Sequence, residues 1–137
     1  DYAAEASQGH WISKADLKRG LEPFEKIRKA CGDKMEVAYE LHSMWSRPQA
    51  IKIAQALEEY SPMWVEDPVF MEHMNSIGEV ARATHSPIAV GETRGGRADF
   101  RYLLELEPLA SMPPDEVVAW VAPNLQRYLD GAAPAAP

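Results

Sequence analysis

The chain has 137 residues, of which 46% are hydrophobic and 26% are charged, values typical of one soluble globular domain. Its formal net charge of −7 argues against a nucleic-acid partner. No apolar run approaches the roughly 18 residues of a membrane span, and the first ten residues lack the basic start and apolar core of a signal peptide. The single cysteine, Cys31, excludes an internal disulfide and favours a reducing compartment, so we expect a cytoplasmic protein.

Turn residues and apolar runs divide the chain into short strands and longer helices. Residues 1–13 are expected to be irregular, and a helix is expected over 14–31, with Ser13 as a cap and Gly32 at its end. Pro23 indicates a break inside that helix. Beyond it, we expect strands over 34–40, 63–66 and 87–92, alternating with helices over 48–60, 75–84 and 98–105.

This alternation predicts an α/β fold with a parallel sheet and helices packed on it. The pattern covers residues 1–106, which we take as one domain. Residues 107–137 differ: we expect a linker, an amphipathic helix over 115–130 kinked at Pro123, and a disordered Ala/Pro tail.

Three glutamates, Glu40, Glu66 and Glu92, each end one of the predicted strands, and each interval is 26 residues. That interval fits one strand, one helix and the return to the next strand, so the carboxylates are expected at the same end of the sheet. Three converging carboxylates need a cation between them to remain charged. Oxygen ligands favour Mg²⁺, with Mn²⁺ as an alternative, over zinc.

Further candidate residues lie in the loops after the strands. His42 stands two residues after Glu40, so an extended backbone would direct both side chains to the same face. A histidine near a cation suits proton transfer. Arg94 and Arg97 follow Glu92 in a glycine-containing loop and are either ligands for a substrate carboxylate or solvated residues.

Other polar and aromatic residues are assigned structural roles. Asp67 is expected to turn the chain and to cap or pair locally rather than to bind metal. Trp45 and Trp64 are expected to pack in the interior rather than to stack on substrate. The histidines outside the loop after the first strand are expected at the surface: His10, His73 and His85.

The segments YELHSMW, WVEDP and PIAVGET, taken in this order and spacing, resemble the metal-binding strand ends of the enolase superfamily, mandelate racemase subgroup. The likeness is closest to its acid-sugar dehydratases of the galactonate and mannonate type, and it runs from about residue 1 to about residue 106. The resemblance implies a partial (β/α)8 barrel with three to four βα units and Mg²⁺ bound by Glu40, Glu66 and Glu92. It also implies His42 as a general acid or base in a lyase reaction. A proton α to a carboxylate is removed, the enolate is stabilised by the metal, and the β-hydroxyl is lost.

The chain departs from that family in ways that leave a second hypothesis open. The family's later Asp/His pair, its capping domain and the racemase Lys-x-Lys are absent from this sequence, and the first ligand is Glu40 rather than the commoner Asp. The alternative is therefore an inactive truncated fragment that keeps the metal site or only the fold. An open barrel exposes strand edges, so we expect either a homo-oligomer that completes it or a C-terminal helix that covers it. The small-molecule partner implied by the resemblance is a sugar acid.

Overall fold

The computed structural model describes residues 2–70 and 74–105. Three βα units follow two N-terminal helices; the units and the second helix were expected from the sequence, and the first helix was not. The elements in chain order are α1 (Tyr2–Ser7), α2 (Lys14–Cys31), the 3₁₀ turn η1 (Gly32–Lys34), β1 (Tyr39–Glu40), α3 (Arg47–Leu57), the 3₁₀ turn η2 (Glu58–Tyr60), β2 (Val65–Glu66), α4 (Met74–Ala83), β3 (Ile88–Ala89) and α5 (Arg97–Glu105).

The three strands form a parallel sheet in the order β1-β2-β3, which confirms the predicted α/β fold. Glu40 pairs with Glu66 in register, and Glu66 pairs with Ala89. Each strand is only two residues long, shorter than predicted, yet single backbone hydrogen bonds extend the pairing on both sides, from Met63 N to Val37 O (2.8 Å) and from Leu41 N to Glu66 O (3.0 Å). The ladder therefore continues to the points where the chain turns.

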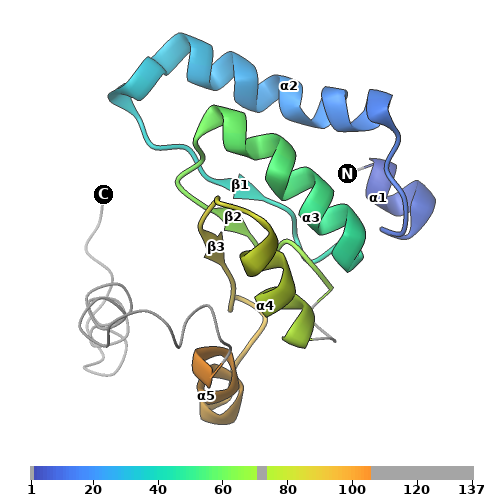
Figure 1. Cartoon of the computed structure of the whole chain (residues 1–137), viewed down its shortest axis with the longest axis vertical. Helices are drawn as coiled ribbons and strands as arrows, with labels where there is room; N and C mark the ends of the chain where they lie inside the picture. Colours follow the sequence, from blue (N-terminus) through green and yellow to red (C-terminus); the bar gives the residue numbers. More distant parts are fainter. Residues whose placement is uncertain (1, 71–73, 106–137) are drawn as a thin grey trace.

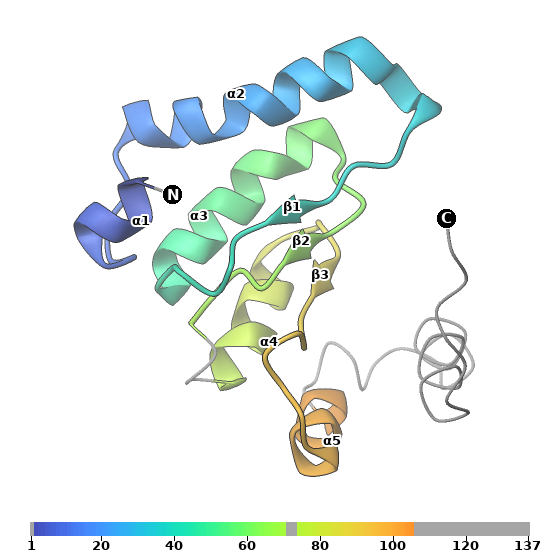
Figure 2. The same ribbon diagram turned by 180° about the vertical axis from the view of Figure 1, so that it is seen from behind.

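Helices cover one face of this sheet in the described part of the chain. Figures 1 and 2, which view the molecule from opposite sides, show α2, α3 and α4 on the same side of the strands. Tyr39 faces this helical layer, since its hydroxyl donates to Gly20 O in α2 (2.6 Å). Because side chains alternate along a strand, Glu40 and Glu66 face the opposite side.

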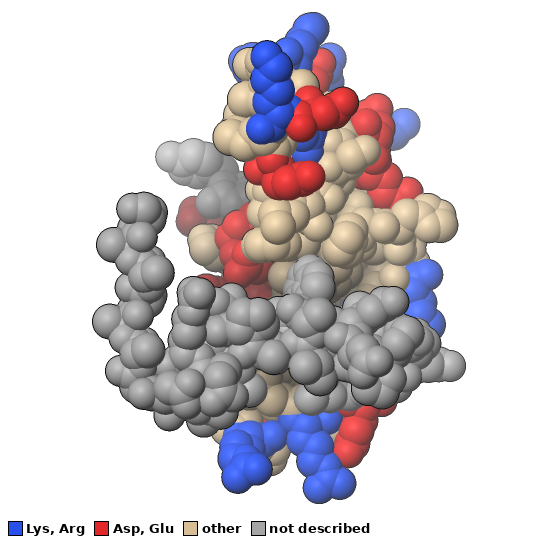
Figure 3. Space-filling model, turned by 90° about the vertical axis from the view of Figure 1, so that its left-hand side faces the viewer, with Lys and Arg blue, Asp and Glu red and all other residues tan. Residues whose placement is uncertain are grey.

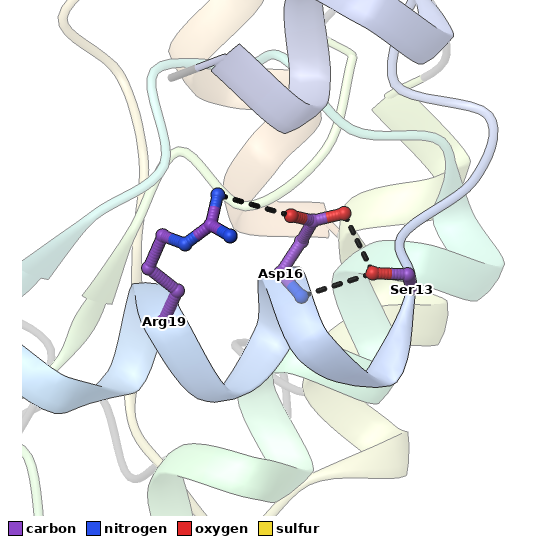
Figure 4. A network of polar contacts seen from close by, with 3 residues as sticks. All are labelled: Ser13, Asp16 and Arg19. Atoms are coloured by element: carbon purple, nitrogen blue, oxygen red, sulfur yellow. Dashed lines mark hydrogen bonds and ion pairs between the residues drawn. The ribbon is translucent and has the colours of Figure 1, made fainter.

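Helix α2 begins and ends where the sequence predicts. The Ser13 hydroxyl accepts a hydrogen bond from Asp16 N (2.9 Å) and donates to the Asp16 carboxylate (2.6 Å), whose other oxygen lies 3.4 Å from Arg19 (Figure 4). The predicted break at Pro23 is wrong, because the helix runs through it without interruption. Pro23 is exposed, so water can bond the backbone carbonyl that the missing N–H leaves without a partner.

The hydrophobic core lies between the sheet and α3 and α4. Trp45, Leu57, Val65 and Val80 are the larger apolar side chains with almost no exposure. Burial of each such side chain stabilises the fold by about 1.5–3 kcal/mol relative to its exposed state. The apolar face of α3, with its buried Ile53 and Leu57, is thus part of the core that supports the sheet.

The N-terminal segment is more ordered than the sequence analysis expects. Tyr2–Ser7 form helix α1, and the chain then turns at Gly9, whose N–H donates to Ala4 O and whose carbonyl accepts from Ser46 N (both 2.9 Å). The expectation of an irregular segment over 1–13 is wrong for α1. Its alanines and Glu5 are good helix formers, but a helix this short depends on tertiary contacts such as buried Ala4.

Charged residues of both signs lie on the surface. Figure 3 shows acidic and basic side chains at the end of the molecule where α2 lies and also at the opposite end, where α5 lies. Among the described helices, none has the length and apolar character needed to cross a membrane. The helix and tail expected within 107–137 lie outside the described residues.

Substitution of Gly9 by alanine should destabilise the protein by about 2 kcal/mol or more. Gly9 has φ +72°, and an added Cβ would lie 1.9 Å from the backbone oxygen of Met44. Thermal unfolding followed by circular dichroism measures the effect. Gly95→Ala is the matched control, because no atom lies within 4 Å of an added Cβ there. Equal melting temperatures for the two variants would contradict this account of the turn.

Candidate metal centre

Glu40, Glu66 and Glu92 come together at the C-terminal end of the sheet, as the sequence predicts. One carboxylate oxygen from each lies within 4.8 Å of the other two. Glu40 and Glu66 are half-buried at the ends of β1 and β2, whereas Glu92 is exposed in the turn after β3. Three side chains distant in sequence therefore form one acidic cluster.

Although the glutamates are equally spaced in sequence, they do not occupy equivalent positions in the register of the sheet. Ala89, and not Glu92, pairs with Glu66, so Glu92 lies three residues further along the chain. Gly91 has φ +133°, and Arg94 N donates to Gly91 O (3.0 Å), so the chain bends sharply here. The expectation that all three residues occupy equivalent strand ends is wrong for Glu92, which reaches the cluster from a turn.

His42 lies beside Glu40, but for a different reason from the one expected. The strand ends at Glu40, and His42 and Ser43 both adopt left-handed backbone conformations with φ +54°. The His42 N–H donates to Glu40 Oε1 (2.6 Å), and its Nδ1 lies 3.4 Å from the same oxygen. A tight turn, and not extended alternation, thus places an exposed imidazole next to the cluster.

Glu66 is held by a contact that the sequence analysis missed. Trp64 Nε1 donates a hydrogen bond to Glu66 Oε2 (3.0 Å). Trp64 is the residue just before β2, and Glu66 is the second residue of β2. Side chains two residues apart on an extended backbone lie on the same face, so these two share a face. Trp64 is half-buried, and its role is therefore not packing alone, whereas Trp45 is buried in the core as expected. The sequence did contain a signal for this contact, because Trp64 and Glu66 are two residues apart and pair an indole donor with a carboxylate acceptor.

Asp67 is the unexpected residue of the site. It turns the chain as predicted, with φ +39°, but its side chain is fully buried, and neither carboxylate oxygen has a well-formed hydrogen bond within the described residues. The expected local pairing of this carboxylate is therefore wrong. Its backbone connects the neighbouring strand ends, since its N–H donates to Ala89 O and its carbonyl accepts from Ser43 N (both 2.8 Å).

The electrostatic environment of Asp67 favours its neutral form. Burial raises the pKa of the Asp67 carboxyl to about 6, the nearby Gly91 N–H opposes the rise, and the charges of the three glutamates add to it. Burial is the largest cause of this shift, and the charges of the glutamates are smaller ones. Asp67 is thus a fourth acidic side chain near the cluster.

The remaining candidates lie at the edges of this region. Arg94 is half-buried in the turn that follows Glu92, and Arg97 is exposed as the first residue of α5. His10 and His85 are exposed, as predicted, and His73 lies outside the described residues. The two arginines share a loop region with Glu92, and their predicted role in substrate binding stays a prediction.

A pocket of about 900 Å³ lies among the N-terminal parts of α3, α4 and α5. It is bordered by the ion pair of Arg47 with Glu79 and by the hydrogen bond from Tyr102 to Asn75. None of the three glutamates lines this pocket. The candidate centre is therefore defined by the converging carboxylates and not by this hollow.

The donor set suits a hard divalent cation. Mg²⁺ binds oxygen at about 2.0–2.1 Å in octahedral geometry, so neighbouring oxygens on one ion lie roughly 3 Å apart and opposite ones roughly 4.2 Å apart. The cluster oxygens all lie within 4.8 Å of one another, so the side chains would have to move closer together to hold one ion. Glu40, Glu66 and Glu92 have the ligand chemistry that Mg²⁺ prefers, and Mn²⁺ would accept the same ligands.

Asp67→Asn should raise the melting temperature of the metal-free chain by a few degrees at pH 8 and by about half as much at pH 5. A folded-state pKa raised to about 6 means that the stability contributed by the protonated carboxyl is lost as the pH rises toward and through 6. The amide stays neutral, and asparagine tolerates a positive φ. Thermal unfolding in a chelating buffer measures this. Asp33→Asn, at an exposed position, is the control. A gain that is equal at both pH values would contradict the explanation.

Comparisons with known proteins agree with the resemblance of the three motifs. The D-galactonate dehydratase of Ralstonia nicotianae is 39% identical over 90 residues, which cover 66% of this chain and 24% of that enzyme. The corresponding enzyme of Ralstonia pickettii is 36% identical over the same length. An enolase of the mandelate racemase subgroup from Agrobacterium tumefaciens is 50% identical, with a TM-score of 0.74 over 77% of this chain and 29% of that structure.

The chain thus matches about a quarter of the length of these curated relatives. Its structural neighbours imply a TIM-barrel type of fold, of which the described residues contain a three-stranded parallel sheet with its helices. The family model for "Enolase C-terminal domain-like" proteins matches residues 3–116, and the chain belongs to that family.

Proposed function

We propose that this chain carries the cation-binding part of an active site for Mg²⁺-dependent dehydration of sugar acids. The observation that carries the proposal is the meeting of Glu40, Glu66 and Glu92, with His42 directly beside them. Similarity to two D-galactonate dehydratases supports the choice of a carboxylate substrate with a β-hydroxyl group. A partial barrel of three βα units is the corresponding proposal for the fold.

The chain's own residues have separate roles in such a reaction. When bound, Mg²⁺ supplies positive charge that stabilises the negative charge developing on a substrate carboxylate during removal of its α-proton. The three glutamates hold that cation, and their combined charge explains why a divalent ion is preferred to a monovalent one. Arg94 and Arg97 are proposed to attract the anionic substrate from the turn after β3.

His42 is proposed to donate the proton that the departing β-hydroxyl requires. Its Nδ1 faces Glu40 Oε1 at 3.4 Å, so Nε2 lies on the opposite side of the imidazole ring. An exposed ring is accessible to substrate, and imidazole exchanges protons near neutral pH. The protonated imidazole is the form that acts as an acid.

A second function is supported by the extent of the match. The match covers only about a quarter of the length of the dehydratases to which the chain is similar. Abstraction of the α-proton needs a base on the other side of the substrate. A chain that binds the cation without turnover is therefore the alternative.

Glu66→Gln should weaken Mg²⁺ binding at least tenfold, because a neutral amide replaces a charged ligand at the centre of the cluster. Isothermal titration calorimetry on the full chain measures the affinity. Glu25→Gln is the matched control, since Glu25 is exposed on α2. If both variants bind Mg²⁺ as tightly as the unsubstituted chain, the cluster is not the cation site.

His42→Asn should reduce dehydration about 100-fold or more while leaving Mg²⁺ affinity nearly unchanged. The hydrogen bond to Glu40 comes from the backbone N–H of His42, and asparagine accepts its left-handed conformation. A panel of aldonic acids, assayed for 2-keto-3-deoxy acid with and without Mg²⁺, measures the rate. His85→Asn, an exposed histidine, is the control. Intact cation binding by the unsubstituted chain without any product favours the non-catalytic alternative.

A further inference from the structure

Two glutamates of the cluster each have one oxygen already engaged by a donor two residues away. Glu40 Oε1 accepts from the His42 N–H at 2.6 Å, and Glu66 Oε2 accepts from Trp64 Nε1 at 3.0 Å. A carboxylate has two oxygens, so in each case the second oxygen remains for a cation. The donor to Glu40 is a backbone N–H. The donor to Glu66 is a side chain, which a substitution can remove.

We propose that Trp64 is a positioning residue of the cation site, which fixes the Glu66 carboxylate through its indole N–H and leaves Oε1 facing the ion. The proposal rests on the cation site described under the proposed function. It adds a residue that acts through Glu66 and touches neither the ion nor the substrate. No role in metal binding follows for Trp64 from the motif of three glutamates alone.

Backbone hydrogen bonds to both neighbouring strands fix the position of the Trp64 main chain. Trp64 O accepts from Tyr39 N (3.0 Å) in β1, and the next residue, Val65, donates to Pro87 O (2.8 Å) beside β3. The residue is thus anchored between both neighbouring strands. A tryptophan side chain has only two rotatable bonds, so its N–H is directed with little loss of freedom. The donor is therefore in place before a cation binds.

Glu66 gains most from such a contact. Its side chain has three rotatable bonds, so ordering it costs conformational entropy. The carboxylate also lies next to Glu40 and Glu92 and close to Asp67, all of which favour rotation away from the cluster when no cation is bound. A hydrogen bond to the charged carboxylate opposes that rotation and keeps the ligand directed inward.

The competing interpretation is that Trp64 only fills space beneath the cluster. Trp64→Phe separates the two, because phenylalanine retains an aromatic ring but has no N–H donor. Loss of a residue that orients a metal ligand reduces metal affinity by about 10–100-fold. A residue that only packs would lower thermal stability without a selective change in cation affinity.

The experiment titrates Mg²⁺ into the full chain and its variants by calorimetry, with melting temperatures recorded in parallel. We expect Trp64→Phe to bind Mg²⁺ 10–100-fold more weakly at a melting temperature within a few degrees of the unsubstituted chain. Trp11→Phe is the matched control, because it is the same substitution at a position that is 62% exposed. Unchanged affinity in Trp64→Phe overturns the proposal.

One further measurement tests the proposal without a variant. If Trp64→Phe does not fold, the indole N–H resonance of Trp64 in the ¹⁵N-labelled unsubstituted chain decides. The chemical shift of this resonance should change as Mg²⁺ is added, with the same affinity as calorimetry measures. A resonance that does not move overturns the proposal. An unsubstituted chain that fails to bind Mg²⁺ overturns both the cation site and the role of Trp64, whereas equal binding by chain and variant overturns the role of Trp64 alone.

Discussion

The parallel pairing of β2 with both of its neighbours is the constraint on which the site depends. Val65 is fully buried, its N–H bonds to the segment of β3, and the residues on either side of it bond to β1. This pairing sets Glu40 and Glu66 in register and brings the turn containing Glu92 to the same edge. The core of α3 and α4 behind the sheet stabilises a layout that three like charges oppose.

The acidic edge is therefore a region of local instability supported by the rest of the fold. Four carboxyl groups influence one another there, and the buried one, Asp67, has its pKa raised to about 6. Groups of like charge with a perturbed pKa are common at functional sites, where a bound cation can offset their repulsion. The same residues that reduce the stability of the metal-free chain would then increase its affinity for a divalent ion.

The sequence predicted more of the fold than of the site's detail. The bounds of α2, the parallel α/β arrangement and the convergence of the three glutamates followed from apolar runs, caps and spacing. The position of Glu92 beyond its strand, the left-handed turn at His42 and the buried carboxylate of Asp67 did not. These depend on positive φ values and on hydrogen bonds such as Trp64 to Glu66, which tertiary packing selects and residue patterns do not encode.

Cation binding and turnover have different structural requirements in this protein. The contacts that orient two of the three ligands are local, each joining residues two apart in sequence. They need only the three-stranded sheet, so a segment that matches a quarter of its relatives' length contains the whole proposed ligand set. Proton abstraction requires a second group across the substrate from His42. The metal site can thus form from this chain's own residues even where the complete reaction needs more of the barrel.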